Sequence, residues 1–172
     1  MKILKWVGII VGVLIVGFLA IGVITPDFSY HNSVTVNAPV EKAYSVFTDE
    51  SKMSEWLTGL QRIENVSGAP LEAGSKWKLV FDEGGRTIEV LEEVTAVDPN
   101  QRFAFNIDTE PFAGTVDIRF AAIDSTTCKI DATSTVDGKN MVWKSVLALS
   151  KSMMTDRAQE QYGLLKRLIE TD

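Results

Sequence analysis

Acidic side chains on one predicted strand are the residues best placed to do chemistry in this sequence. Glu92 shares its parity with Val90 and Val94, whereas Glu89 and Glu93 have the opposite parity. A carboxyl group that faces an apolar interior has a raised pKa and can act as a general acid or base near neutral pH. Two alternatives remain open, since a bulge would turn Glu92 outward and an edge strand would expose it.

Other charged side chains offer weaker leads. Asp117 or Arg119 could join Glu92 in acid–base chemistry, and Arg119 or Arg157 could pair with the carboxylate or head group of a ligand. A solvated surface charge is the simpler explanation of each arginine. The sequence therefore identifies no catalytic residue and favours a binding protein over an enzyme.

The residue types that build catalytic triads and metal sites are scarce. His31 is the sole histidine, so a Ser–His–Asp triad or a site with several histidine ligands is not expected. Cys128 is the sole cysteine, which excludes an intrachain disulfide. The pair Gly84–Gly85 lies in a predicted hairpin and does not precede a helix, unlike a phosphate-binding loop. No metal and no cofactor are predicted.

The net charge of the chain argues against partners that are themselves strongly acidic. The chain has a net charge of −6, and Lys2 and Lys5 are the only charged residues before Asp27. The remaining residues therefore carry 15 basic and 23 acidic side chains, a net charge of −8. Nucleic acids and anionic lipid surfaces attract basic patches, so binding to nucleic acid and flat docking on anionic lipid are not expected.

The N-terminal segment Trp6–Ile24 is apolar throughout. Its 19 residues would span about 30 Å as a helix, which matches the hydrocarbon core of a bilayer. A cleaved signal peptide is the alternative, but its apolar region is usually shorter. Gly8 and Gly12 have the spacing of a helix-dimerisation motif, although glycine is common in membrane helices.

Basic residues predict the orientation of this segment. Lys2 and Lys5 precede it, and the next lysine or arginine is Lys42. The positive-inside rule then places the N-terminus in the cytoplasm and the rest of the chain outside it, as a single-pass membrane protein. We expect two parts: a transmembrane anchor over residues 1–26 and a ligand-binding domain over residues 27–172.

The domain is predicted to be α+β. Residues 31–37 alternate as a strand, Val40–Phe47 has the periodicity of a short helix, and a second short helix carries Met53, Trp56 and Leu57. One long helix is predicted from Met141 to Glu170. Between the helices the pattern predicts six strands, near residues 60–66, 75–82, 86–97, 102–109, 114–123 and 127–136.

These elements predict an internal cavity. A seven-stranded antiparallel sheet twists and curls, and a long helix laid across the open side leaves space that side chains do not fill. The alternative is that the same side chains simply fill a core. The residues predicted to line the cavity and bind a ligand are Trp77, Leu79, Phe81, Phe103, Phe105, Ile118, Phe120, Met153 and Met154.

Three motifs carry a resemblance to a known family. The segments Val36–Asp49 and Ser54–Trp56, and Val94–Pro99 followed by Arg102 and Phe103, resemble the START/Bet v 1-like (SRPBCC) superfamily, in particular its polyketide cyclase/dehydrase and lipid-transport branch. The resemblance covers about residues 31–170. It implies a helix-grip fold, with the curved sheet wrapped on the long C-terminal helix around an apolar ligand cavity. Members include lipid and sterol carriers, hormone binders and aromatic cyclases.

Three functions are compatible with these observations. The leading hypothesis is a membrane-tethered module that holds an apolar small molecule or lipid. The alternatives are a cyclase or dehydratase acting in the same cavity, and an envelope module that binds a protein through an exposed apolar patch. The sequence identifies neither the ligand nor a protein partner.

Overall fold

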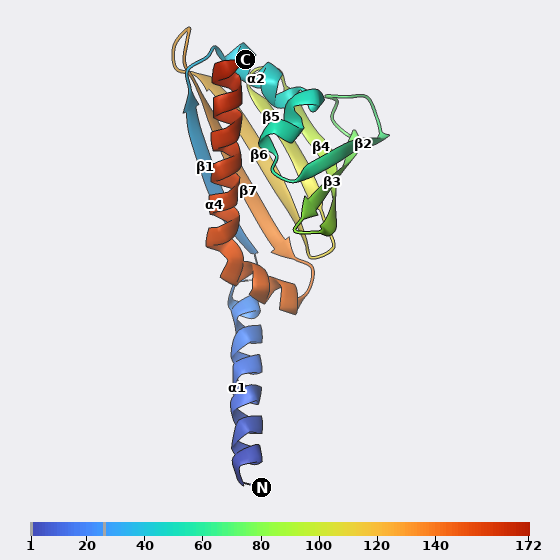
Figure 1. Cartoon of the computed structure of the whole chain (residues 1–172), viewed down its shortest axis with the longest axis vertical. Coiled ribbons are helices and arrows are strands. Elements are labelled where there is room, and N and C mark those ends of the chain that lie inside the picture. The colour runs from blue at the N-terminus through green and yellow to red at the C-terminus, as the bar shows by residue number, and fades with distance from the viewer. Residues whose placement is uncertain (1, 26) are drawn as a thin grey trace.

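The computed structural model describes residues 2–25 and 27–172 (Figure 1). In chain order the elements are α1 (Lys2–Ile24), β1 (Asp27–Val36), α2 (Val40–Thr48), the 3-10 helix η1 (Glu50–Lys52), α3 (Met53–Trp56), β2 (Leu60–Ser67), β3 (Lys76–Glu83), β4 (Arg86–Asp98), β5 (Arg102–Asp108), β6 (Phe112–Ala122), β7 (Cys128–Gly138) and α4 (Met141–Thr171). The predicted α+β order is confirmed, although the first strand begins at Asp27 and not at His31.

The seven strands form one antiparallel sheet in the order β1-β7-β6-β5-β4-β3-β2. The strands from β2 to β7 are joined as a meander, and β1 pairs with β7 along its whole length. The β3–β4 hairpin closes through Gly84 and Gly85, whose φ angles of 62° and 85° are typical of glycine in a tight hairpin turn. The sheet is curved, and α4 lies along its inner face (Figure 1).

The main hydrophobic core lies where α2 and the C-terminal half of α4 cover the sheet. Leu165 and Ile169 of α4 are completely buried. The rings of Tyr44 and Phe47 from α2 both contact Phe120 of β6, with centroids 5.2 Å and 5.4 Å away. This end of the molecule is filled by side chains, so unfilled space has to lie further along the inner face of the sheet.

Helix α1 projects from the opposite end of the domain (Figure 1). Its side chains are exposed from Leu4 to Gly17, whereas those from Phe18 to Gly22 are partly or fully buried. The segment Leu4–Ile24 is long and apolar enough to cross a membrane, and a signal sequence would satisfy the same criteria.

We expect Leu165→Ala to lower the free energy of unfolding by about 2–5 kcal/mol, because it leaves a cavity in a fully packed region. Val66→Ala truncates a side chain that is 54% exposed, and it should change the free energy of unfolding by less than about 0.5 kcal/mol. Chemical denaturation of both variants in detergent measures the difference. Equal stabilities would show that α4 is not packed as described.

Candidate functional site

A pocket of about 240 Å³ lies between the inner face of the sheet, α3 and the middle of α4. We call it the inner pocket. Most of the side chains that line it are aromatic or aliphatic. Its lining residues are Tyr30, Phe47, Met53, Trp56, Leu57, Leu79, Phe81, Val90, Glu92, Phe103, Phe105, Ile107, Thr109, Phe112, Val116, Ile118, Ser134, Ala158, Gln161 and Tyr162.

A second pocket of about 410 Å³ adjoins it on the side of α4 and is called here the outer pocket. The two pockets share several lining residues, among them Tyr30, Phe81 and Val90. The outer pocket also reaches Leu147 and Ser150 in the N-terminal half of α4. It therefore extends from the inner pocket towards the surface, alongside the first turns of the helix.

The predicted ligand-binding residues occupy four places in the structure. Trp77 lines a small neighbouring pocket of about 50 Å³, where its indole N–H donates to Ser75 Oγ at 3.2 Å. Phe120 is buried in the main core and does not line the inner pocket. Met153 and Met154 line the outer pocket. The remaining five line the inner pocket: Leu79, Phe81, Phe103, Phe105 and Ile118.

Several lining residues were missed by the sequence analysis. Tyr30 enters from β1 because that strand begins four residues earlier than predicted. Met53 and Trp56 both enter from α3, and Tyr162 enters from α4. Helical periodicity places Tyr162 on the inner face of α4, so the signal for this residue was present in the sequence.

Glu92 is the one carboxyl group among the described residues that line the inner pocket. It pairs across the sheet with Trp77 on β3 and Ile107 on β5. The bulge in β4 lies between Val94 and Ala96, after Glu92, so Glu92 keeps the inward phase of Val90. The alternative of an outward-turned Glu92 is therefore excluded by the register.

The environment of Glu92 is apolar. Among the described residues, its carboxyl group makes no hydrogen bond or ion pair, and its partly accessible surface faces the inner pocket and the small pocket beside Trp77. Burial raises the pKa of this carboxyl to about 8, from an ordinary value of 4.5. At neutral pH Glu92 is therefore mainly protonated and can donate a hydrogen bond into the pocket.

Two phenols add neutral polar groups to the same space. Burial raises the pKa of Tyr30 and of Tyr162, so both hydroxyls stay protonated. The indole N–H of Trp56 is buried without a hydrogen-bond partner among the described residues. The pocket thus offers several neutral polar groups on an apolar wall.

The other charged candidate residues lie outside the inner pocket. Asp117 projects from the outer face of β6, where Arg102 binds it at 2.8 Å and the exposed Arg119 lies 3.5 Å away. Arg157 forms an ion pair with Glu83 at the rim of the outer pocket. Strand parity explains the result for Asp117, since its neighbours Val116 and Ile118 face inward and turn it outward.

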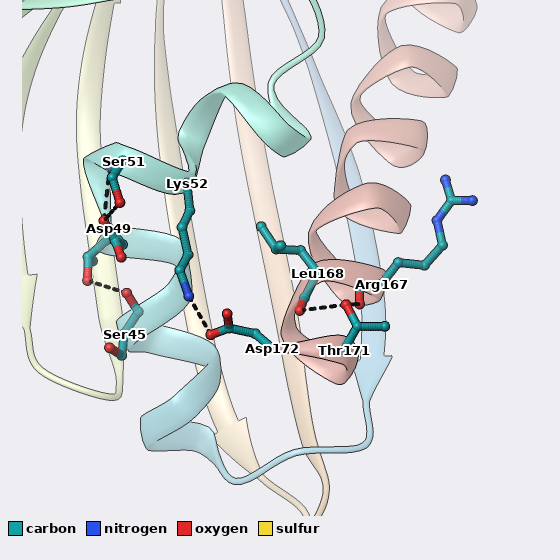
Figure 2. A network of polar contacts seen from close by, with 9 residues as sticks. Ser45, Asp49, Ser51, Lys52, Arg167, Leu168, Thr171 and Asp172 are labelled. Atoms are coloured by element: carbon teal, nitrogen blue, oxygen red, sulfur yellow. Dashed lines mark hydrogen bonds and ion pairs between the residues drawn. The ribbon is translucent and has the colours of Figure 1, made fainter.

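Polar contacts hold the short helices over the inner pocket. Asp49 caps η1 by accepting from the backbone N–H of Ser51 at 3.0 Å, and Lys52 forms an ion pair with Asp172 beyond the end of α4 (Figure 2). The ring of Trp56 packs on Phe47 with centroids 5.5 Å apart. The covering helices are therefore fixed to both the core and α4.

The curved antiparallel sheet, the long C-terminal helix and the apolar pocket between them define a helix-grip protein of the Bet v 1-like superfamily. A family model described as polyketide cyclase/dehydrase and lipid transport matches residues 27–170, and the chain belongs to this family. The family has a fold that binds hydrophobic ligands. No protein of curated function matches the chain.

Solved structures of the same fold include proteins of different activity. Ara h 8.0201 has 18% identity and a TM-score of 0.67, with 85% of this chain and 99% of that chain covered. Zhui aromatase/cyclase from Streptomyces sp. R1128 has 12% identity and a TM-score of 0.64, with 83% of this chain and 96% of that chain covered. Norcoclaurine synthase from Thalictrum flavum, in complex with dopamine and hydroxybenzaldehyde, has 14% identity and a TM-score of 0.62, with 83% of this chain and 86% of that chain covered. These likenesses show the fold.

Glu92→Gln should remove a pH dependence of stability. Folding raises the pKa of Glu92, so ionisation of this carboxyl group favours the unfolded chain. Below about pH 4.5 the group is protonated in both states and does not make the free energy of unfolding depend on pH. As the pH rises from there towards 8, the free energy of unfolding falls by up to a few kcal/mol. We expect the variant to match the unmodified chain near pH 4 and to be more stable near pH 9. Denaturation at both pH values measures this, with the outward-facing Glu89→Gln as control.

Proposed function

We propose that this chain is a membrane-anchored binding protein for an apolar small molecule or lipid. In this proposal residues 1–26 form a single-pass anchor with a cytoplasmic N-terminus, and residues 27–172 form the binding domain outside the cytoplasm. The observation that carries the proposal is the inner pocket, whose wall is apolar and whose carboxyl group is neutral near pH 7. Such a wall favours an uncharged apolar guest.

The size of the pockets supports a ligand that is longer than the inner pocket. About 240 Å³ is below the usual 300–1,000 Å³ range for ligand sites, and the adjoining 410 Å³ outer pocket brings the space into that range. Each buried Å² of apolar ligand surface contributes roughly 25 cal/mol before the costs of ordering. An elongated ligand would therefore place its end in the inner pocket and continue along α4.

Glu92 favours a second candidate function, an enzyme of the cyclase or dehydratase type. A carboxyl group with a pKa of about 8 holds a proton at neutral pH and can deliver it to a bound oxygen. The family description and the aromatase/cyclase of the same fold are compatible with this chemistry. Tyr30 and Tyr162 would then orient the substrate by hydrogen bonds.

Filling the inner pocket should abolish binding. Val90→Trp places a large side chain in the pocket, whereas Leu91→Trp, one residue along β4, projects from the outer face. Native mass spectrometry of the purified full chain, with identification of copurified lipids, measures occupancy. We expect the bound lipid to be lost in Val90→Trp alone. An unmodified chain without any bound molecule would count against the proposal.

The same measurement on Glu92→Gln separates the two candidate functions. A binding protein should carry the same molecule with and without the substitution, since glutamine preserves the shape of the pocket. A dehydratase should carry product when unmodified and substrate in the variant, and the two molecules would differ by one water. Glu89→Gln is the matched control, because its carboxyl group lies on the outer face of the same strand.

A further inference from the structure

Helix α1 is packed directly on the first turns of α4. The backbone N–H of Gly22 donates to Ser145 Oγ at 3.1 Å, and Ser145 is completely buried. A Cβ atom at position 22 would lie 2.6 Å from Ser145 Oγ and 2.7 Å from the carbonyl oxygen of Met141. Only glycine allows this close approach, so the two helices touch at backbone distance.

This contact determines how deep α4 lies relative to α1. Gly22 is two residues before the end of α1 at Ile24, a rise of about 3 Å. Figure 1 shows the first turns of α4 beside the domain end of α1. If α1 spans a bilayer, the start of α4 lies at the level of the last turn of the span, where the hydrocarbon core meets the head groups.

The same part of α4 carries an exposed apolar stripe. Val142, Leu149 and Met153 are 52%, 62% and 66% exposed, and their spacings of seven and four residues place them on one face of the helix. Lys144 and Lys151 lie about half a turn away, on the opposite face of α4, where Lys151 Nζ is 5.5 Å from the ring centroid of Phe28. An apolar face with lysines on the opposite face is typical of helices that lie in a membrane interface.

The charges nearby indicate that this contact is apolar and not electrostatic. Lys144 is paired with Asp137 at 3.1 Å, Lys139 is paired with Asp108, and the domain as a whole is acidic. Binding of the stripe to a neutral, zwitterionic bilayer therefore needs no attraction between basic side chains and anionic lipids.

The stripe also borders the outer pocket. Met153 belongs to both, and Leu147, Ser150 and Met154 line the pocket from neighbouring positions of α4. A ligand leaving the inner pocket along α4 would therefore reach the stripe before it reached bulk water on that side.

We propose that residues 141–154 of α4 lie in the membrane interface, with the stripe of Val142, Leu149 and Met153 in contact with acyl chains, and that the outer pocket takes its ligand from that bilayer. The inference rests on the proposed anchor. It adds the source of the ligand, a lipid of the same membrane, and the route, along the first turns of α4.

Depth measurements on the full chain test this directly. Single cysteines at Leu149→Cys, Met153→Cys, Leu14→Cys and Glu160→Cys carry an environment-sensitive fluorophore, while the fully buried Cys128 stays unlabelled. The protein is reconstituted in phosphatidylcholine vesicles that contain lipid with a nitroxide on the acyl chain. We expect strong nitroxide quenching at positions 14, 149 and 153 and strong iodide quenching only at 160.

Each other outcome is decisive. Iodide quenching at 149 and 153, with nitroxide quenching at 14, overturns the interfacial contact and leaves the anchor intact. Iodide quenching at 14 contradicts the anchor and this inference together. Protection of 149 from both quenchers means that a protein covers the stripe, which also overturns the inference.

Gly22→Leu tests whether the helix contact sets the depth, because leucine cannot fit against Ser145. We expect nitroxide quenching at position 149 to fall several-fold and bound lipid to decrease, while quenching at position 14 is retained. Gly17→Leu is the matched control, since a Cβ atom there meets nothing within 4 Å. Unchanged quenching at 149 in Gly22→Leu would contradict the role assigned to this contact.

Discussion

The pocket depends on one geometric constraint: a single helix cannot cover a curved seven-stranded sheet. Helix α4 packs mainly on β1 and β7, at one edge of the sheet, and α2 fills the space above β6 at one end. The inner faces of β3, β4 and β5 are left to the short helices, of which α3 is a single turn. Protein interiors tolerate few voids, and the space bounded by large aromatic side chains on these strands departs from that close packing.

The same geometric constraint changes the protonation of the Glu92 carboxyl group. A glutamate at an inward position of a fully packed sheet would be costly, because its carboxyl group would lack both water and a partner. Beside the pocket the group keeps some accessible surface, yet its surroundings disfavour the charged form. The residue therefore carries a proton at a pH where exposed carboxylates are ionised, and the pocket determines this property.

Strand parity explains most of what could be predicted from the sequence. Leu79, Phe81, Phe103, Phe105 and Ile118 face inward as their alternation indicated, and Glu92 does too. Parity does not indicate how far along a strand the pocket extends. Trp77 and Phe120 have the inward parity but lie beyond the inner pocket. Phe120 meets α2 in the filled core, a contact between distant segments that no local pattern reveals.

The two ends of α4 are held by different neighbours, and this links the position of the pocket to that of α1. The C-terminal end is fixed by the buried Leu165 and Ile169 and by the ion pair of Lys52 with Asp172. The N-terminal end is fixed against α1 at Gly22, and Figure 1 shows that α4 bends between these ends. Ser150 bonds back to the carbonyl of Val146 at 2.9 Å, a contact that favours bending of a helix. Both pockets border the stretch of α4 between the two fixed ends, so α1 is held at a fixed position relative to the pocket opening.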